Sequence, residues 1–198
     1  MLSSDKNIEA DAVIVGKGVR PNIQLVQESE IAINQGIMVD ETMRTNVPNV
    51  FAAGDVAEGL NLITGQRQVI ATWPNACSQG QTAGLNMAGG QDKNQGLNSN
   101  ICGFLGNTVA SVGITKPEND DYEERVTQDP AKGLYRKLVW NKKDELVGAV
   151  LMGKTADIGV ISNLIRNRVK IPKEKRSQMV RSNIRYGDYF SQKTGHFF

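Results

Sequence analysis

Short apolar runs, each ended by glycine or a polar turn, mark the first part of the chain. Residues 10–15 (Ala-Asp-Ala-Val-Ile-Val) are rich in β-branched side chains and end at the Gly-Lys-Gly of residues 16–18, which predicts a strand. Residues 50–53 (Val-Phe-Ala-Ala) form a second run, typical of a strand buried on both faces. Apolar and polar positions alternate over residues 31–40 on either side of Gly36, which predicts a β-ribbon.

Residues 57–68 indicate a polar loop. After this loop, apolar and small residues recur at the spacing of a helix. Pro74 is well placed as the first residue of a helix, with Thr72 or Trp73 near its cap. The helix is predicted to run to Met87 and to stop at the two glycines that follow Ala88. A stripe of mostly small side chains would let it lie close to a sheet or a ligand, and comprises Ala76, Gly80, Ala83 or Gly84, and Met87.

The second half of the chain begins after a polar stretch rich in glycine and asparagine at residues 91–100, which predicts a linker. Residues 157–168 carry apolar side chains on one helical face and predict a helix. Strands are predicted at residues 108–114, 122–128, 135–140 and 146–152, the last two joined as a hairpin. We therefore expect an α/β part followed by an α+β part, in which a helix packs on an antiparallel sheet.

Composition suits one large or two small globular domains, because the 198 residues are 39% hydrophobic and 22% charged. No apolar run approaches the roughly 18 residues that span a membrane. The N-terminus also lacks the layout of a signal peptide, so we expect a cytoplasmic protein that does not act in a membrane. Cys77 and Cys102 fit neither a metal site nor a CxxC pattern.

Positive charge is concentrated at the end of the chain. Residues 170–198 hold seven Lys or Arg and two Asp or Glu, a net of +5, so residues 1–169 carry −3 of the total of +2. A basic segment with scattered aromatic residues can bind nucleic acid, an acidic redox partner or an anionic surface. We favour a solvated helix whose aromatic side chains dock on its own domain or on a second subunit, and expect no binding of nucleic acid.

The strongest candidate for chemistry is the end of the apolar run at residues 50–53. Gly54 removes the side chain there, and Asp55 adds a carboxylate. Ligands of open α/β sheets lie beyond the carboxyl ends of the strands, and a carboxylate accepts hydrogen bonds from sugar or polyol hydroxyls. The two residues therefore indicate the edge of a cofactor site, while an Asp that caps the next turn is an equally valid interpretation.

These residues also resemble a known family. Thr-x-x-Pro-Asn-Val-Phe-Ala-Ala-Gly-Asp at residues 45–55 is similar to the second flavin-binding motif of the FAD-dependent pyridine nucleotide-disulfide oxidoreductases. In that family the Asp binds the ribityl or pyrophosphate part of FAD, which implies this role for Asp55, with Gly54 allowing close approach. Residues 10–22 resemble the strand that returns from the NAD domain and ends near FAD, which adds Gly16 and Arg20 as cofactor-binding candidates.

The start of the predicted helix is the third part of the candidate site. A helix N-terminus presents free amides and a partial positive charge. In the resembled family this end of the helix faces the N1–C2=O edge of the isoalloxazine, which implies that Trp73, Pro74 and Asn75 border the flavin. A packing helix with an interfacial tryptophan is the alternative.

The second half resembles the C-terminal interface domain of the same family. Residues 135–140, the hairpin, residues 146–152 and the helix that follows are most similar to the branch of NADH oxidases, rubredoxin reductases and nitrite reductases. The resemblance divides the chain into an incomplete FAD/NAD(P)-binding domain (1–95), an interface domain of the dimerisation type (100–171) and a basic aromatic tail (172–198).

Several signatures of the family do not occur in the sequence. It holds no G-x-G-x-x-G followed by a helix and an acidic residue, neither for the ADP half of FAD nor for NAD(P)H. The redox CxxxxC and the His-x-x-x-x-Glu pair of the disulfide-reducing branch do not occur either, and the only histidine is His196. We therefore assign no catalytic residue and expect a C-terminal part of a family member.

Two hypotheses follow. The first is a fragment of a flavoprotein oxidoreductase that passes electrons from NAD(P)H through FAD to an acceptor, inactive alone because positioning of both cofactors needs the missing fingerprints. The second is a non-catalytic module that dimerises or docks a partner. An exposed sheet edge would favour a homodimer, pairing with the missing N-terminal part, or a redox partner protein.

Overall fold

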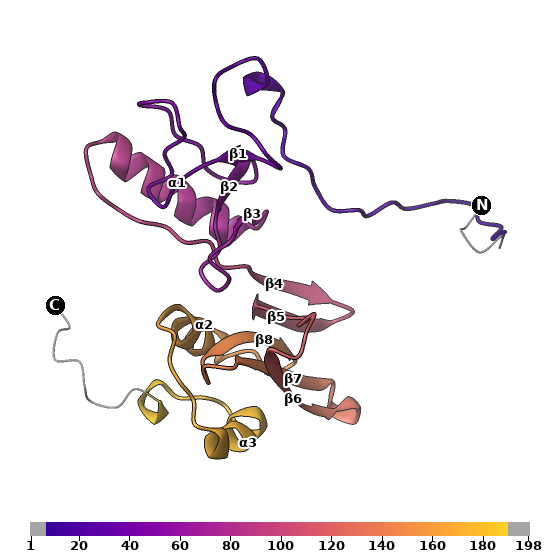
Figure 1. Cartoon of the computed structure of the whole chain (residues 1–198). Coiled ribbons are helices and arrows are strands. Elements are labelled where there is room, and N and C mark those ends of the chain that lie inside the picture. The colour runs from indigo at the N-terminus through magenta and orange to yellow at the C-terminus, as the bar shows by residue number, and fades with distance from the viewer. Residues whose placement is uncertain (1–6, 190–198) are drawn as a thin grey trace.

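The computed structural model describes residues 7–189 and arranges their elements in two groups (Figure 1). The first group is a small sheet covered by one helix, namely β1 (Ile37–Met38), β2 (Ala57–Leu60), β3 (Arg67–Val69) and α1 (Trp73–Met87). The second group is a five-stranded sheet with α2 (Ile158–Arg166) and α3 (Lys173–Arg181) packed on it. Short 3-10 turns occur at η1 (Gln24–Val26), η2 (Pro130–Lys132) and η3 (Tyr186–Asp188). The mixed α/β architecture expected from the sequence is confirmed.

The small sheet contains a hairpin where the sequence predicted only a polar loop at residues 57–68. β1 pairs in parallel with β2, and β2 pairs antiparallel with β3. Asn61 closes the turn between β2 and β3, because its Oδ1 accepts the N–H groups of Ile63 and Thr64 at 2.8 and 3.0 Å. The prediction was wrong because β2 and β3 consist largely of residues with low β propensity, so the pairing depends on this turn and on neighbouring segments.

A buried carboxylate holds the predicted turn at Gly36 against β2. Glu58 is 2% exposed, and its carboxylate accepts the N–H of Gln35 at 2.8 Å, that of Gly36 at 3.0 Å and Nδ2 of Asn34 at 2.8 Å. Burial alone would raise the pKa of Glu58, but these hydrogen bonds and the charge of Arg67 outweigh it and hold the pKa below its ordinary value. The carboxylate is therefore ionised, and it fixes the turn that begins β1.

Two predicted strands of the first part do not form. Residues 10–15 lie in an extended arm that points away from both groups (Figure 1), and Ile14 is 97% exposed. Residues 50–53 contribute a single bridge, between Phe51 and Arg44. Residues 10–15 find no partner strand for their backbone groups within residues 7–189. Residues 50–53 pair only locally with residues 43–45, where the N–H groups of Thr45 and Ala52 donate to the carbonyls of Val50 and Met43.

Helix α1 has the predicted bounds but buries a different face. Pro74 lies in its first turn, it ends at Met87, and Gly89 follows with a φ of +89°. Of the predicted stripe of small residues only Ala83 is buried, and the buried face is otherwise polar: Asn75, Gln79, Thr82 and Asn86. These side chains hydrogen-bond to the backbone of loops and to Asp92, which a hydrophobic pattern does not reveal.

The five-stranded sheet is antiparallel with the order β4-β5-β8-β7-β6. All four predicted strands are confirmed as β5 (Asn107–Gly113), β6 (Tyr122–Asp129), β7 (Leu134–Asn141) and β8 (Leu146–Met152). The additional strand β4 (Ser99–Phe104) begins inside the predicted linker. It is an edge strand, so its side chains are mostly exposed and show no clear alternation. Leu105 and Gly106, both with positive φ, form the tight turn to β5.

Helices α2 and α3 close the core of the second group. α2 confirms the predicted helix and buries Ile161, Leu164 and Ile165. α3 belongs to the segment predicted as a solvated helix whose aromatic side chains dock on its own domain or on a second subunit. The helix is not simply solvated, because it packs on β6 and β7 and buries Met179 and Val180 in the same core, and the aromatic Tyr189 packs against that core as well. The tail is therefore folded onto the sheet as far as residue 189, and residues 190–198, with His196, lie outside the described part.

Candidate functional site

The turn that carries Gly54 and Asp55 is held by its own backbone and by α1. Gly54 has a φ of +86°, which glycine adopts at little cost. Its N–H donates to Oε1 of Gln79 at 2.9 Å, and its carbonyl accepts the N–H of Ala57 at 2.9 Å. The Asp55 side chain is exposed, and among residues 7–189 its carboxylate caps no turn. The turn therefore presents a carboxylate to solvent.

The start of α1 leaves Trp73 and Pro74 exposed. Trp73 is 82% exposed, and the first turn of the helix contains no acidic residue that would neutralise its partial positive charge. The capping residue Thr72 makes no capping hydrogen bond, and its Oγ1 is buried without a partner in the described part of the chain. Asn75 differs, because it is buried and its Nδ2 donates to the carbonyl of Ile70 at 3.0 Å.

A groove of about 390 Å³ lies beside Trp73 and Pro74. This volume is within the range of small-molecule sites, roughly 300–1,000 Å³. The opposite wall comes from the second group of elements, namely Ser99, Asn100 and Ile101 of β4, Ser111 of β5, and Ile158, Gly159 and Ser162 of α2. At the start of α1, both groups of elements therefore contribute to one concave surface.

Five of the seven sequence candidates gather along the first half of α1, namely Gly54, Asp55, Trp73, Pro74 and Asn75. The structure does not bring Gly16 and Arg20 to this place. Both are exposed on the arm, and no atom lies within 4 Å of the position that a Cβ on Gly16 would occupy. Binding of a cofactor by these two residues remains a prediction.

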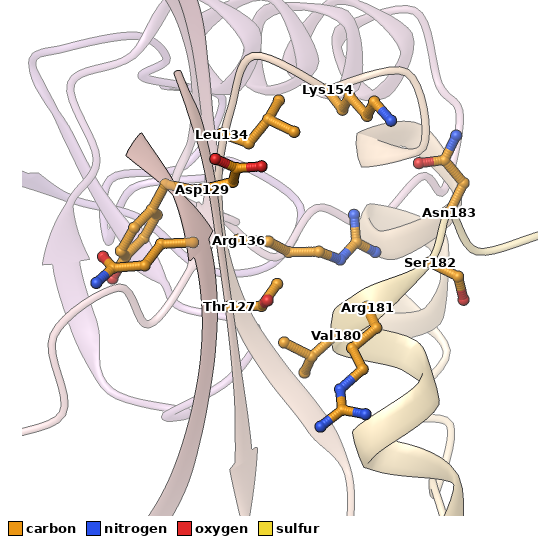
Figure 2. Close-up of a pocket in the computed structure, with 11 residues that line it drawn as sticks. Thr127, Asp129, Leu134, Arg136, Lys154, Val180, Arg181, Ser182 and Asn183 are labelled. Atoms are coloured by element: carbon orange, nitrogen blue, oxygen red, sulfur yellow. The ribbon is translucent and has the colours of Figure 1, made fainter. Parts of the chain in front are cut away.

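A second hollow, of about 160 Å³, lies between β6, β7 and the end of α3 (Figure 2). The side chain of Arg136 crosses it and points from the sheet toward Ser182 and Asn183. None of the sequence candidates lines this hollow. The positive charge of Arg136 is partly neutralised, because its Nη1 and Nη2 donate to the two carboxylate oxygens of Asp157 at 3.1 and 2.7 Å. The Nε of Arg136 donates to the carbonyl of Met179.

Asp157 is the buried centre of this arrangement. It also accepts the N–H of Ile184 at 2.9 Å, so it connects α2, β7 and the segment after α3. Burial alone would raise the pKa of Asp157, but the hydrogen bonds from Arg136 and Ile184 and the charge of Arg136 hold that pKa below its ordinary value. The position of Asp157 before an apolar helix was the only sequence signal for it, and no sequence pattern pointed to its partner Arg136 or to Gln79.

None of the helices formed by residues 7–189 combines the length and the apolar character that a bilayer crossing requires.

Comparison with models of protein families gives two matches. Residues 1–80 match the family described as pyridine nucleotide-disulphide oxidoreductase, and residues 99–169 match the rubredoxin NAD+ reductase C-terminal domain. The first match ends within α1, and the second begins at Ser99, the first residue of β4, where the second sheet begins.

Curated proteins and solved structures give similar results. The chain is 32% identical over 174 residues to the NADH-dependent phenylglyoxylate dehydrogenase subunit epsilon of Aromatoleum evansii, covering 86% of this chain and 41% of the relative. It is 37% identical over 121 residues to a CoA-dependent NAD(P)H sulfur oxidoreductase of Pyrococcus furiosus, covering 60% and 27%. A NAD-dependent persulfide reductase from A. fulgidus superposes with a TM-score of 0.72 at 27% identity, over 89% of this chain and 35% of that one. The chain thus spans less than half the length of these relatives.

Proposed function

The chain belongs to the family of FAD-dependent pyridine nucleotide-disulfide oxidoreductases, and we propose that it forms one side of the FAD site in an enzyme that passes electrons from NAD(P)H to an acceptor. Members of this family depend on FAD and use NAD(P)H. The observation that carries the proposal is the exposed carboxylate of Asp55, presented on a left-handed glycine turn that is fastened to α1.

The residues at the start of α1 fit a flavin. Thr72 Oγ1 is buried without a partner in the described chain, and the first turn of α1 holds no acid, so an electron-rich ring edge at the helix start would meet a partial positive charge. The exposed faces of Trp73 and Pro74 offer apolar contact for a ring. Asn75 fits a supporting role better, because its amide donates to a backbone carbonyl within the chain.

Each group has a distinct task in this proposal. The Asp55 carboxylate only accepts hydrogen bonds, which suits the hydroxyls of the ribityl chain. The amides at the start of α1 stabilise negative charge on the polar edge of the ring, and Trp73 keeps water from it. When bound, FAD supplies the electron-transfer chemistry, and the residues of this chain bind and orient it. Because the sequence holds no G-x-G-x-x-G fingerprint, we further propose that these 198 residues alone bind FAD weakly and do not turn over NAD(P)H.

A docking function is the second candidate, and the exposure of β4 favours it. Among residues 7–189 no strand pairs with the outer edge of β4, which carries the exposed apolar side chains of Ile101 and Phe104 and is followed by exposed Leu105. The matched C-terminal domain is named after a reductase of rubredoxin, a redox protein. A redox partner or a second copy of the chain are therefore the proposed occupants of this surface.

Titration of the purified chain with FAD, followed by flavin fluorescence and gel filtration, tests the first candidate. Asp55→Ala should weaken binding roughly 10- to 150-fold, the loss expected for a hydrogen bond to a charged group. The matched control is Asp120→Ala, an exposed acid of the second group that should leave affinity unchanged. Equal affinity of wild type and Asp55→Ala would refute the role of Asp55. If the wild type binds no FAD and is dimeric, the docking function is favoured.

A further inference from the structure

We propose that Gln79 is a positioning residue, which holds the turn of Gly54 and Asp55 in the conformation that presents the Asp55 carboxylate to the cofactor. The inference rests on the proposed function only for the identity of the ligand. Gln79 was not a candidate from the sequence, and it does not line the groove beside Trp73.

The contact that carries the inference is buried and links two remote segments. Gln79 is 2% exposed, and its Oε1 accepts the N–H of Gly54, 25 residues earlier in the chain, at 2.9 Å. Gly54 is left-handed at this point, so its N–H points toward α1 instead of continuing an extended strand. Together with the hydrogen bond from the Ala57 N–H to the Gly54 carbonyl, this bond sets the direction in which the chain leaves toward Asp55.

The same bond sets the spacing between the two halves of the candidate site. Gln79 lies six residues after Trp73, about 9 Å along the helix axis. With Gly54 attached there, Asp55 lies beside the first half of α1, while the helix start faces the groove. A ligand that contacts both would therefore extend along the first half of α1, which suits an elongated molecule carrying a ring at one end and hydroxyls further along.

Thr82 and Asn86, two other buried polar residues of α1, hydrogen-bond to segments other than the Gly54 turn, so their variants are matched controls. Thr82 Oγ1 donates to Asp92 at 2.6 Å, and Asn86 bonds to the backbone of Thr42 and Asp92. Removing either bond weakens the packing of the same helix without touching Gly54. A general loss of stability can therefore be distinguished from a specific loss of position.

The experiment compares Gln79→Met, which keeps the size but removes the acceptor, with Gln79→Glu, which keeps an acceptor, and with Thr82→Val. Amide hydrogen exchange of Gly54 is measured in the full chain without FAD, corrected for global stability, and FAD affinity is then titrated. In Gln79→Met the Gly54 amide should exchange roughly 3- to 10-fold faster, and FAD affinity should fall by a similar factor. Thr82→Val should leave the exchange of Gly54 near that of the wild type. Gln79→Glu, which buries a carboxyl group but keeps an acceptor, should show slower exchange of Gly54 than Gln79→Met after correction for global stability.

Unchanged exchange of Gly54 in Gln79→Met overturns the proposal. Faster exchange with unchanged FAD affinity also overturns it, because the turn would then not need to be held for binding. If the wild type binds no FAD, the proposed function fails, while the exchange rates still decide whether Gln79 holds the turn.

Discussion

Removal of the Asp157 carboxylate should destabilise the second group of elements more than removal of an exposed charged group does. In Asp157→Ala, the guanidinium of Arg136, whose side chain is 10% exposed, loses both of its carboxylate contacts, and the N–H of Ile184 loses its acceptor. Breaking a buried ion pair by deleting one partner costs about 3–5 kcal/mol, because the remaining charge stays buried. Arg136 lines the hollow between β6, β7 and α3 but is only 8% exposed as a residue, so water would screen its charge only in part.

Urea denaturation followed by tryptophan fluorescence measures the effect, because Trp140 lies in the core of the second group. With a slope near 2 kcal/mol per M, a loss of about 4 kcal/mol lowers the midpoint by about 2 M. The control is Asp121→Ala, which removes an exposed pair with Lys142 and should cost at most about 1 kcal/mol.

The reasoning also predicts the outcome of removing both charges. The double variant Arg136→Met, Asp157→Leu should recover most of the loss, because replacing a buried pair by apolar side chains is often neutral or stabilising. If Asp157→Ala shifts the midpoint no more than Asp121→Ala does, Asp157 does not fasten α2 and the segment after α3 to the sheet.

Three further predictions follow from buried groups. Glu58→Gln should lower stability by about 2–3 kcal/mol in a thermal melt, because the amide cannot accept all three hydrogen bonds that the carboxylate accepts. Gly148→Ala should cost about 3 kcal/mol or more in urea, because the new Cβ would overlap the carbonyl of Ile114, whereas Gly103→Ala meets no atom within 4 Å and should be nearly neutral. Glu58 and Asp157 have lowered pKa values, so their stabilisation is present above the unfolded pKa values of about 4 and is lost as the pH falls below them, which urea midpoints at pH 7, 5 and 3.5 would show.

The sequence was most informative where local chemistry alone decides the structure. Pro74 and Gly89 bound α1 correctly, because a proline in the first turn and a left-handed glycine after the end act on the backbone directly. The run at residues 146–152 was found because its apolar side chains are buried in the second core as β8. Local propensity and tertiary packing agree at these places.

Predictions from the sequence were wrong or incomplete where the structure depends on contact with a remote segment of the chain. The runs at residues 10–15 and 50–53 have the composition of strands, but composition does not say whether a neighbouring strand is present. β4 was missed because an exposed edge strand needs no apolar pattern. The candidate site was found through Gly54 and Asp55, but its support by Gln79 was not, because a buried amide is recognisable only once its partner is known.

The buried polar face of α1 affects how the protein tolerates amino-acid substitutions around this helix. A helix seated on aliphatic side chains can rotate or slide slightly when a neighbour changes size, since dispersion contacts have little directionality. The hydrogen bonds of Gln79, Thr82 and Asn86 each form at only one rotation of α1 about its axis. A shift of the helix by one residue would turn every side chain by about 100°. The hydrogen bonds of α1 are satisfied together in only one alignment of the helix. A substitution in one contacting loop that shifts α1 should therefore weaken the bonds to the other loops as well.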